Sequence, residues 1–254
     1  MRGSLSRVTT LLAALTLLAP AGRAGAAELK VLSTIALGEA WHDLQPKLES
    51  TGHKLTLVLG TSGGINKRIA DGEPGDVIVS TSGGIEGLAK AGKVTAATSV
   101  PVARSQVGLA VLRGAARPDI STPEALKQTL LAAKAVAYSD PAGGGASGIH
   151  FAKVLDRLRI AQQVNARARL GRAVPNAAAV VKGEADIAVQ QIPELLAVPG
   201  VEVIGPLPGD LGNTTTFSAA VLATTRDPAA AKALVDFLRS PETVATLKAK
   251  GFEM

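Results

Sequence analysis

The side chains of this chain that could bind a ligand are mostly hydroxyls and amides, set among glycines in short turns. Two such turns lie close together, Leu32-Ser33-Thr34-Ile35-Ala36-Leu37-Gly38 and Leu59-Gly60-Thr61-Ser62-Gly63-Gly64-Ile65. Each follows an apolar run typical of a buried strand and precedes a stretch with helical spacing. Such a turn leaves backbone N–H groups free at the start of a helix, an arrangement that binds anions. The two turns therefore predict a cleft for a small anion.

The second turn offers Thr61, Ser62 and Gly63 as ligand contacts. Hydroxyls and N–H groups at a helix start can hold a dianion without a positively charged side chain. The alternative is that Thr61 or Ser62 only caps the helix, as Ser and Thr commonly do.

A glycine-rich loop, Gly143-Gly144-Gly145-Ala146-Ser147-Gly148, precedes another predicted helix. Its glycines would let the backbone approach a ligand closely, with Ser147 and Gly148 as the predicted contacts. A flexible loop without ligand contacts is the alternative. The loop is not a P-loop, since no Gly-Lys-Ser or Gly-Lys-Thr follows it.

Three amide side chains follow later in the chain. Gln190 and Gln191 are neighbours on a predicted strand, so one should face the cleft and the other away from it. An amide can donate to an oxyanion or to a carboxylate. Asn176 is expected at the start of a helix, either as its cap or with its backbone near the ligand.

Composition excludes several kinds of chemistry. The chain has no cysteine, so thiol catalysis, disulfides and Cys metal sites are excluded, and aromatic residues make up only 2% of it, too few for a stacking platform. His42, His53 and His150 are scattered, without metal-site spacing. No Ser, His and Asp residues come together in the form of a catalytic motif. We therefore expect a binding protein without catalytic residues, metal or cofactor.

Residues 1–26 have the features of a secretory signal peptide. Arg2 and Arg7 precede an apolar run over 8–18, which is shorter than the ~20 residues of a membrane span. Ala24-Gly25-Ala26 offers a cleavage site, and no lipobox cysteine follows. Removal of the leader lowers the net charge from +6 to +3, and the basic stretch 167–172 is expected to be a solvated loop. We therefore expect a soluble periplasmic protein that does not bind nucleic acid.

Strand-like and helix-like segments alternate along the chain, which indicates an α/β fold with mainly parallel sheets. The predicted strands are residues 29–33, 55–59, 76–80, 107–112, 135–138, 186–190, 201–204 and 218–223. The predicted helices are 37–50, 65–71, 84–91, one beginning at Thr122-Pro123-Glu124, 147–158, 176–182, 228–238 and 241–250.

Two segments, 100–105 and the long polar run 205–216, are predicted to cross between lobes. The crossings divide the chain into lobe I, residues 28–103 plus 206–254, and lobe II, residues 104–205. Arg104 stands at the first crossing, where a guanidinium could bind a carboxylate or phosphate; a surface or hinge arginine is the alternative.

Five motifs in order resemble the type II periplasmic solute-binding proteins of ABC importers, in the branch that contains the molybdate-binding proteins. They are the turn at 33–37, Thr61-Ser62-Gly63-Gly64, Pro74-Gly75-Asp76-Val77-Ile78-Val79-Ser80, Asp140-Pro141 with Ala146-Ser147-Gly148-Ile149, and Gly183-Glu184-Ala185-Asp186. The resemblance covers nearly the whole chain after residue 26. It implies two lobes, each a mixed, mainly parallel sheet flanked by helices, with a ligand cleft between them.

The resemblance also implies which positions would contact the ligand. Ser62 matches the second-loop serine of the family, and the third-loop backbone donor falls near Ser147. The first-loop serine falls on Ala36, whose N–H remains, with Ser33 or Thr34 as a substitute hydroxyl. The family tyrosine falls on Gln191.

The expected function is capture of a small anion by a monomer that closes around it and delivers it to an ABC importer permease. A molybdate- or tungstate-type oxyanion is the leading ligand. A small organic anion, either a carboxylate or a phosphorylated acid, is the alternative and would be favoured by Arg104 and the two glutamines. Two further alternatives are a ligand sensor with the same fold and a periplasmic enzyme that acts on an anionic metabolite.

Overall fold

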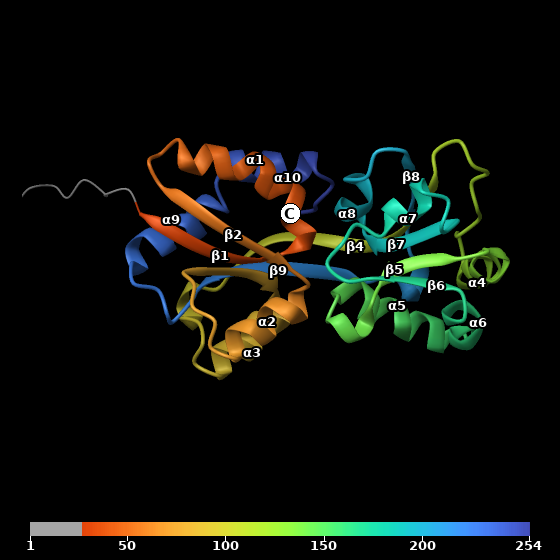
Figure 1. The fold of residues 1–254 in the computed structure, drawn as a ribbon, viewed down its shortest axis with the longest axis horizontal. Coiled ribbons are helices and arrows are strands. Elements are labelled where there is room, and N and C mark those ends of the chain that lie inside the picture. Colours follow the sequence, from red (N-terminus) through yellow and green to blue (C-terminus); the bar gives the residue numbers. More distant parts are fainter. Residues whose placement is uncertain (1–26) are drawn as a thin grey trace, which may run out of the picture.

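The computed structural model describes residues 27–254, so the predicted signal peptide lies outside the described part. Within it, a mixed sheet runs through two halves placed side by side (Figure 1). The strand order is β2-β1-β3-β9-β4-β7-β5-β6, and β8 pairs with β4. The strands are β1 (Glu28–Thr34), β2 (Lys54–Gly60), β3 (Val77–Thr81), β4 (Val100–Leu112), β5 (Val136–Ser139), β6 (Ala168–Gly171), β7 (Ile187–Gln191), β8 (Val201–Pro206) and β9 (Thr214–Val221).

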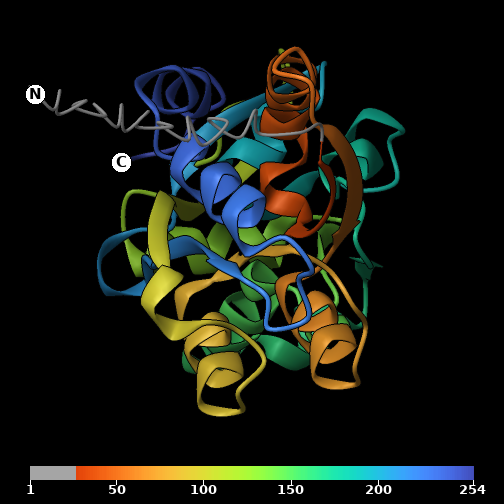
Figure 2. The same ribbon diagram turned by 90° about the vertical axis from the view of Figure 1, so that its left-hand side faces the viewer.

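The first half contains β1, β2 and β3, which are parallel, together with the antiparallel β9 and the beginning of β4. Helices cover both faces of this sheet (Figure 2). One face carries α1 (Gly38–Glu49), α9 (Pro228–Phe237) and α10 (Pro241–Ala249), and the other carries α2 (Ser62–Ala70) and α3 (Ser82–Lys90).

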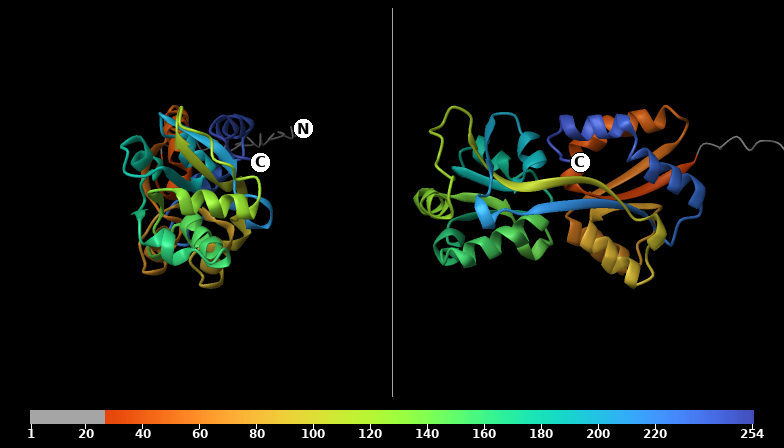
Figure 3. Two further views of the ribbon diagram at one scale, coloured as in Figure 1. Left: turned by 90° about the vertical axis from the view of Figure 1, so that its right-hand side faces the viewer. Right: turned by 180° about the vertical axis from the view of Figure 1, so that it is seen from behind.

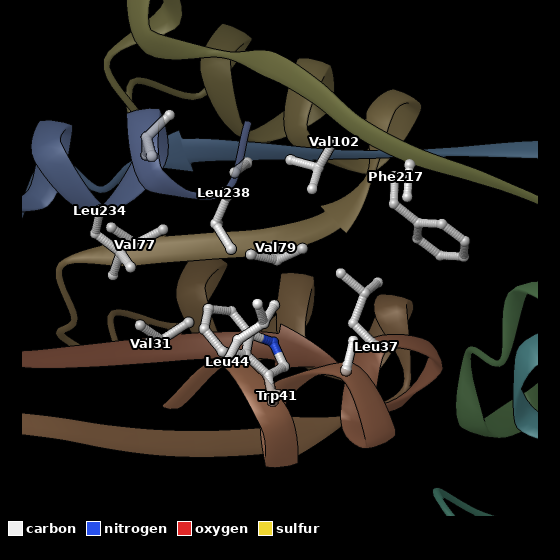
Figure 4. Close-up of a cluster of buried hydrophobic side chains, with 14 of the residues drawn as sticks. Val31, Leu37, Trp41, Leu44, Val77, Val79, Val102, Phe217, Leu234 and Leu238 are labelled. Carbon is white, nitrogen blue, oxygen red and sulfur yellow. The ribbon is translucent and has the colours of Figure 1, made fainter. Parts of the chain in front are cut away.

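Alternation along each strand explains why both faces are covered. In β3, Val77 and Val79 pack toward α1 and α9, whereas Ile78 packs toward α2 and α3. Successive strand residues point to opposite faces, so a strand buried on both sides reads as one continuous apolar run. The core on the side of α1 and α9 surrounds the fully buried Trp41 (Figure 4). The Nε1 of Trp41 donates to Ser33 Oγ at 2.8 Å.

The second half is organised in the same way around β5, β6, β7, β8 and the end of β4. One face packs against α4 (Pro123–Ala132), α5 (Ala146–Arg157) and α6 (Ala161–Asn165). The other face packs against α7 (Ala177–Val181) and α8 (Ile192–Leu196).

Two long antiparallel strands, β4 and β9, connect the halves (Figure 3). The segments predicted as loose crossings are therefore largely strand: residues 100–105 begin β4, and 214–216 begin β9. Their polar residues pair across the junction, as Arg104 does with Thr216. Leu207 and Leu211, within the second predicted crossing, pack into the core of the second half. The predicted lobe boundaries stay predictions.

The prediction of a solvated loop at 167–172 is wrong over Ala168–Gly171, because these residues form β6 beside β5. This strand lies at the end of the strand order, and its exposed Arg169 and Leu170 explain why its composition resembles a loop. The short helices α6 and α8 were also absent from the prediction, because five residues carry too little periodicity.

Candidate functional site

A small cavity of about 20 Å³ lies where the two halves meet. The first half contributes residues from the ends of β1 and β2 and from β9: Thr34, Ile35, Ala36, Thr61, Ser62 and Phe217. The second half contributes Ser139, Gly145, Ala146 and Ser147 around the start of α5. It also contributes Ala173, Gln190, Gln191 and Glu194.

Hydroxyl groups form the wall on the side of the first half. Ser62 begins α2 directly after the strand β2, and its Oγ donates to Thr34 Oγ1 at 3.0 Å. Thr34 also accepts from the backbone N–H of Ala36 at 3.4 Å. Thr61 caps α2, because its Oγ1 accepts from Gly64 N at 3.0 Å. Thr61 therefore caps the helix and also lines the cavity, so the cap and a ligand contact are compatible at this turn.

A similar wall forms on the side of the second half. Ser147 Oγ donates to Ser139 Oγ at 3.3 Å, and Asn176 Nδ2 donates to the same oxygen at 3.0 Å. Ser139 ends β5, and α5 starts at Ala146 after the glycines. A Cβ at Gly148 would lie 1.9 Å from Ser139 O, so only glycine lets α5 sit this close to the strand.

The electrostatics of the cavity favour an anion. The N-termini of α2 and α5 meet there from opposite halves, and their first-turn N–H groups carry partial positive charge. Among the described residues that line the cavity, none is Lys, Arg or His. Hydrogen bonds from hydroxyl, amide and backbone groups are therefore what this site offers to a negative charge.

The two glutamines are both buried but have different partners. Gln190 Oε1 accepts from Asn176 N at 2.8 Å, and its Nε2 donates to Val174 O at 3.2 Å and to Glu194 Oε1 at 2.6 Å. Gln191 Nε2 donates to Thr215 Oγ1 at 3.0 Å, whereas its Oε1 is buried without a partner within residues 27–254. Buried polar atoms are normally paired, so Gln191 has capacity left for a ligand.

Glu194 is the one ionisable residue among the described residues that line the cavity. Burial raises the pKa of its carboxyl to about 7, although the hydrogen bond from Gln190 acts in the opposite direction. This carboxyl therefore changes charge near neutral pH.

The halves also touch each other directly beside the cavity. Thr61 Oγ1 donates to Gly143 O at 2.5 Å, and Gly63 N donates to Gly144 O at 3.0 Å. A Cβ at Gly63 would lie 2.9 Å from Gly144 Cα, and Gly144 itself has a φ of +73°. The contact needs glycine on both sides, because neither backbone could come so close with a side chain present.

Seven of the eleven residues predicted to bind ligand line this cavity: Thr34, Ala36, Thr61, Ser62, Ser147, Gln190 and Gln191. Both glutamines line it, although alternation along the strand predicted that only one would face the cleft. Three others support it from behind, since Gly63 bridges the halves, Gly148 allows close packing, and Asn176 holds Ser139 and Gln190. The ligand roles themselves stay predictions.

Arg104 lies outside the cavity. Its side chain is exposed and donates to the carbonyl of Met254, and its backbone N–H donates to Glu253 O at 2.8 Å. The guanidinium therefore ties β4 to the C-terminus, as expected for the surface or hinge alternative.

Sequence reasoning missed several residues that line the cavity, among them Ser139, Ala146, Ala173 and Glu194. Ser139 directly follows the predicted strand 135–138 and precedes the Asp140-Pro141 motif, which was a usable signal. Glu194 stands four residues after Gln190, but only the short, unpredicted helix α8 turns it into the cavity. Ala173 carries no chemical signal, although its φ of +52° is unusual for alanine.

Within residues 27–254, no group of three or more His, Cys, Asp or Glu side chains is placed to hold a metal ion. Over the same residues, no helix has the length and apolarity needed to cross a membrane.

Residues 29–253 match a family model described as bacterial extracellular solute-binding protein. The chain is 34% identical to a protein from Pseudomonas sp named aconitate isomerase, over 89% of this chain and 87% of that protein. It is 30% identical to the molybdate-binding protein ModA of Azotobacter vinelandii, over 99% of both chains.

Solved structures share the fold at low sequence identity. The periplasmic molybdate-binding protein of Azotobacter vinelandii superposes with a TM-score of 0.74 at 20% identity, covering 89% of this chain and 99% of that one. The sulfate-binding protein SubI of Mycobacterium tuberculosis H37Rv superposes with a TM-score of 0.71 at 22% identity, covering 89% and 86%. These likenesses confirm the two-lobed α/β fold expected from the sequence.

Proposed function

The chain belongs to the bacterial extracellular solute-binding proteins, and we propose that it binds a small tetrahedral oxyanion of the molybdate or tungstate type. The observation that supports this most is the cavity between the halves. It is lined by hydroxyls, amides and two helix N-termini, and its described lining contains no cation. Such a site can hold a dianion through hydrogen bonds alone.

The size of the cavity favours a compact ion. A single water position needs about 10–15 Å³ in the same measure, so the cavity of about 20 Å³ suits a ligand of only a few atoms. A tricarboxylate would require the halves to stand further apart. The 30% identity to a protein named for molybdate over the whole chain supports the same ligand class.

The mechanism would be closure of the two halves around the ligand. An anion that contacts Ser62 on one half and Ser147 on the other stabilises the closed form by its higher affinity for that form. The closed protein would then deliver the anion, in the periplasm and as a monomer, to the membrane permease of an ABC importer. A sensor that presents the same closed form to a receptor is the alternative.

A second candidate function is binding or isomerisation of a tricarboxylate. The 34% identity to a protein named aconitate isomerase supports it, and so does the Glu194 carboxyl in the cavity. Moving a double bond along a carbon chain requires a group that removes a proton from one carbon and returns one to another. A carboxyl with a pKa of about 7 could do both at neutral pH.

Calorimetric titration of residues 27–254 separates these functions. The ligands are molybdate, tungstate, sulfate, phosphate, citrate and the two aconitate isomers, and proton NMR follows cis-aconitate incubated with the protein. Binding of the oxyanions alone supports the first proposal. Conversion of cis-aconitate, or binding of tricarboxylates without oxyanions, would overturn it in favour of the second.

A further inference from the structure

Glu194 presents a charge problem for anion binding, because its carboxyl lines the same cavity as the hydroxyls and helix N-termini. We propose that the complex holds one proton between Glu194 and the bound anion, so that capture of a fully deprotonated anion takes up a proton from solution. The inference rests on the proposed anion site and adds a pH dependence to it.

The position of Glu194 makes it a fixed part of the site. It follows β7 on α8, and Gln190 Nε2 donates to its Oε1 at 2.6 Å. Gln190 is held in turn by Asn176 N at 2.8 Å and Val174 O at 3.2 Å. The carboxyl is therefore tied to the buried network that also positions Ser139.

The surroundings of Glu194 supply no cation to balance its charge. Glu39 and His42 of α1 line a second cavity of about 240 Å³ together with Glu194. His42 is mostly exposed and lies beside Asp43, at 3.5 Å. Glu39 adds negative rather than positive charge. Within residues 27–254, Glu194 takes part in no ion pair with Lys, Arg or His.

The charged side chains on the other elements packed against α8 interact with groups other than Glu194. On β4, Arg104 is exposed and bonded to the carbonyl of Met254. On β8, Glu202 pairs with Arg117. The strand β7 and the turn Ile35–Leu37 carry no ionisable side chain. Arg172, in the segment that leads to Val174, pairs with Asp140 at 2.6 Å.

Without a cation, an ionised Glu194 would repel a bound anion, whereas a protonated one can donate a hydrogen bond to it. Burial already raises the pKa of Glu194 to about 7, so the proton costs little near neutral pH. Gln191, which also lines the cavity, has its Oε1 buried without a partner in the described chain and adds no positive charge.

Sulfate and molybdate are the test ligands, because both are fully deprotonated from pH 6 to 9. The dissociation constants of both anions should change little with pH near pH 6, and should rise about tenfold per pH unit above pH 7. Calorimetry at pH 8, in two buffers of different ionisation enthalpy, should show uptake of nearly one proton per anion. Glu194→Gln should bind with little pH dependence and take up no proton.

Glu39→Gln and His42→Gln are the matched controls, since both positions flank Glu194 without lining the anion cavity. Both variants should keep the pH dependence. Oxyanion binding that is independent of pH in the unsubstituted protein, or loss of the dependence in either control, would overturn the inference and leave the anion site standing. Failure of every oxyanion to bind at pH 6 would instead overturn the proposed function itself.

Discussion

At the scale of single residues, the site depends on hydroxyls that are held by one another. Thr34, Ser62, Ser139 and Ser147 are all buried, and they form two hydrogen-bonded pairs, Ser62 with Thr34 and Ser147 with Ser139. Each pair fixes the direction of the hydroxyl whose O–H group is not used within the pair. A ligand then meets preformed donors, which lowers the ordering cost of binding.

Replacing Ser62 by Ala should weaken oxyanion binding roughly tenfold to a hundredfold, because Ser62 Oγ holds the Thr34 hydroxyl in place and a hydrogen bond to a charged group contributes about 1.5–3 kcal/mol. Calorimetric dissociation constants check this. Ser99→Ala is the control, since Ser99 is exposed and lies outside the cavity. Equal affinities in the two variants would remove Ser62 from the set of ligand contacts.

Glu194 should also affect the stability of the ligand-free protein. Its pKa is about 7 in the folded state against an ordinary value of 4.5, so folding favours the protonated form. The stability from this group is complete below pH 4.5, falls as the pH rises toward 7, and is level above that. Denaturant unfolding of Glu194→Gln should lack this fall, which amounts to at most about 3 kcal/mol. A pH profile of Glu194→Gln parallel to that of the unsubstituted protein would contradict the assignment.

At the scale of elements, α2 and α3 show that one local sequence can serve two purposes. Both begin with the same pentapeptide, Thr-Ser-Gly-Gly-Ile, at 61–65 and at 81–85. The first copy lines the anion cavity and touches the other half, whereas Ser82 of the second copy bonds Ser218 Oγ at 2.7 Å. The difference comes from where β2 and β3 end relative to the other half.

This duplication provides a matched pair of variants. Gly63→Ala should hinder closure and raise the dissociation constant of the oxyanion at least tenfold, because its Cβ would lie 2.9 Å from Gly144 Cα. Gly83→Ala occupies the same helical position with no described atom within 4 Å of the new Cβ, so it should bind normally. Titration of both variants tests this, and equal binding would show that the Gly63–Gly144 approach is dispensable.

At the scale of the whole molecule, two halves, each with a core on both faces of its sheet, are joined by the continuous strands β4 and β9 (Figure 3). Each half has its own buried interior, so the halves can move relative to each other without exposing either core. The resemblance to the type II periplasmic solute-binding proteins is confirmed by the family match over residues 29–253 and by the shared fold.

Ligand binding should therefore make the protein more compact and also more stable. At a hundred times the dissociation constant, an oxyanion should raise the free energy of unfolding by about 2.7 kcal/mol. Small-angle scattering should show a smaller radius of gyration with ligand, and Gly63→Ala should remain extended under the same conditions. Stabilisation of the unsubstituted protein without any compaction would mean that the ligand binds to a form that is already closed.

The sequence by itself determined the strand and helix pattern, the fold class and most of the hydroxyl-bearing turns. These follow from local periodicity and from the chemistry of strand ends, which short segments carry on their own. Thr34, Thr61, Ser62 and Ser147 were predictable for this reason.

Only the tertiary structure decided which of these groups meet. It placed Glu194 in the cavity and bonded Arg104 to Met254 at the C-terminus. It also gave the two Thr-Ser-Gly-Gly-Ile turns different surroundings, one at the cavity and one beside Ser218. It also made strands of residues 100–105, predicted as a crossing, and of residues 168–171, predicted as part of a loop. The physical reason is the same in each case: a long-range contact depends on how two halves pack, and no local window of the sequence contains both partners.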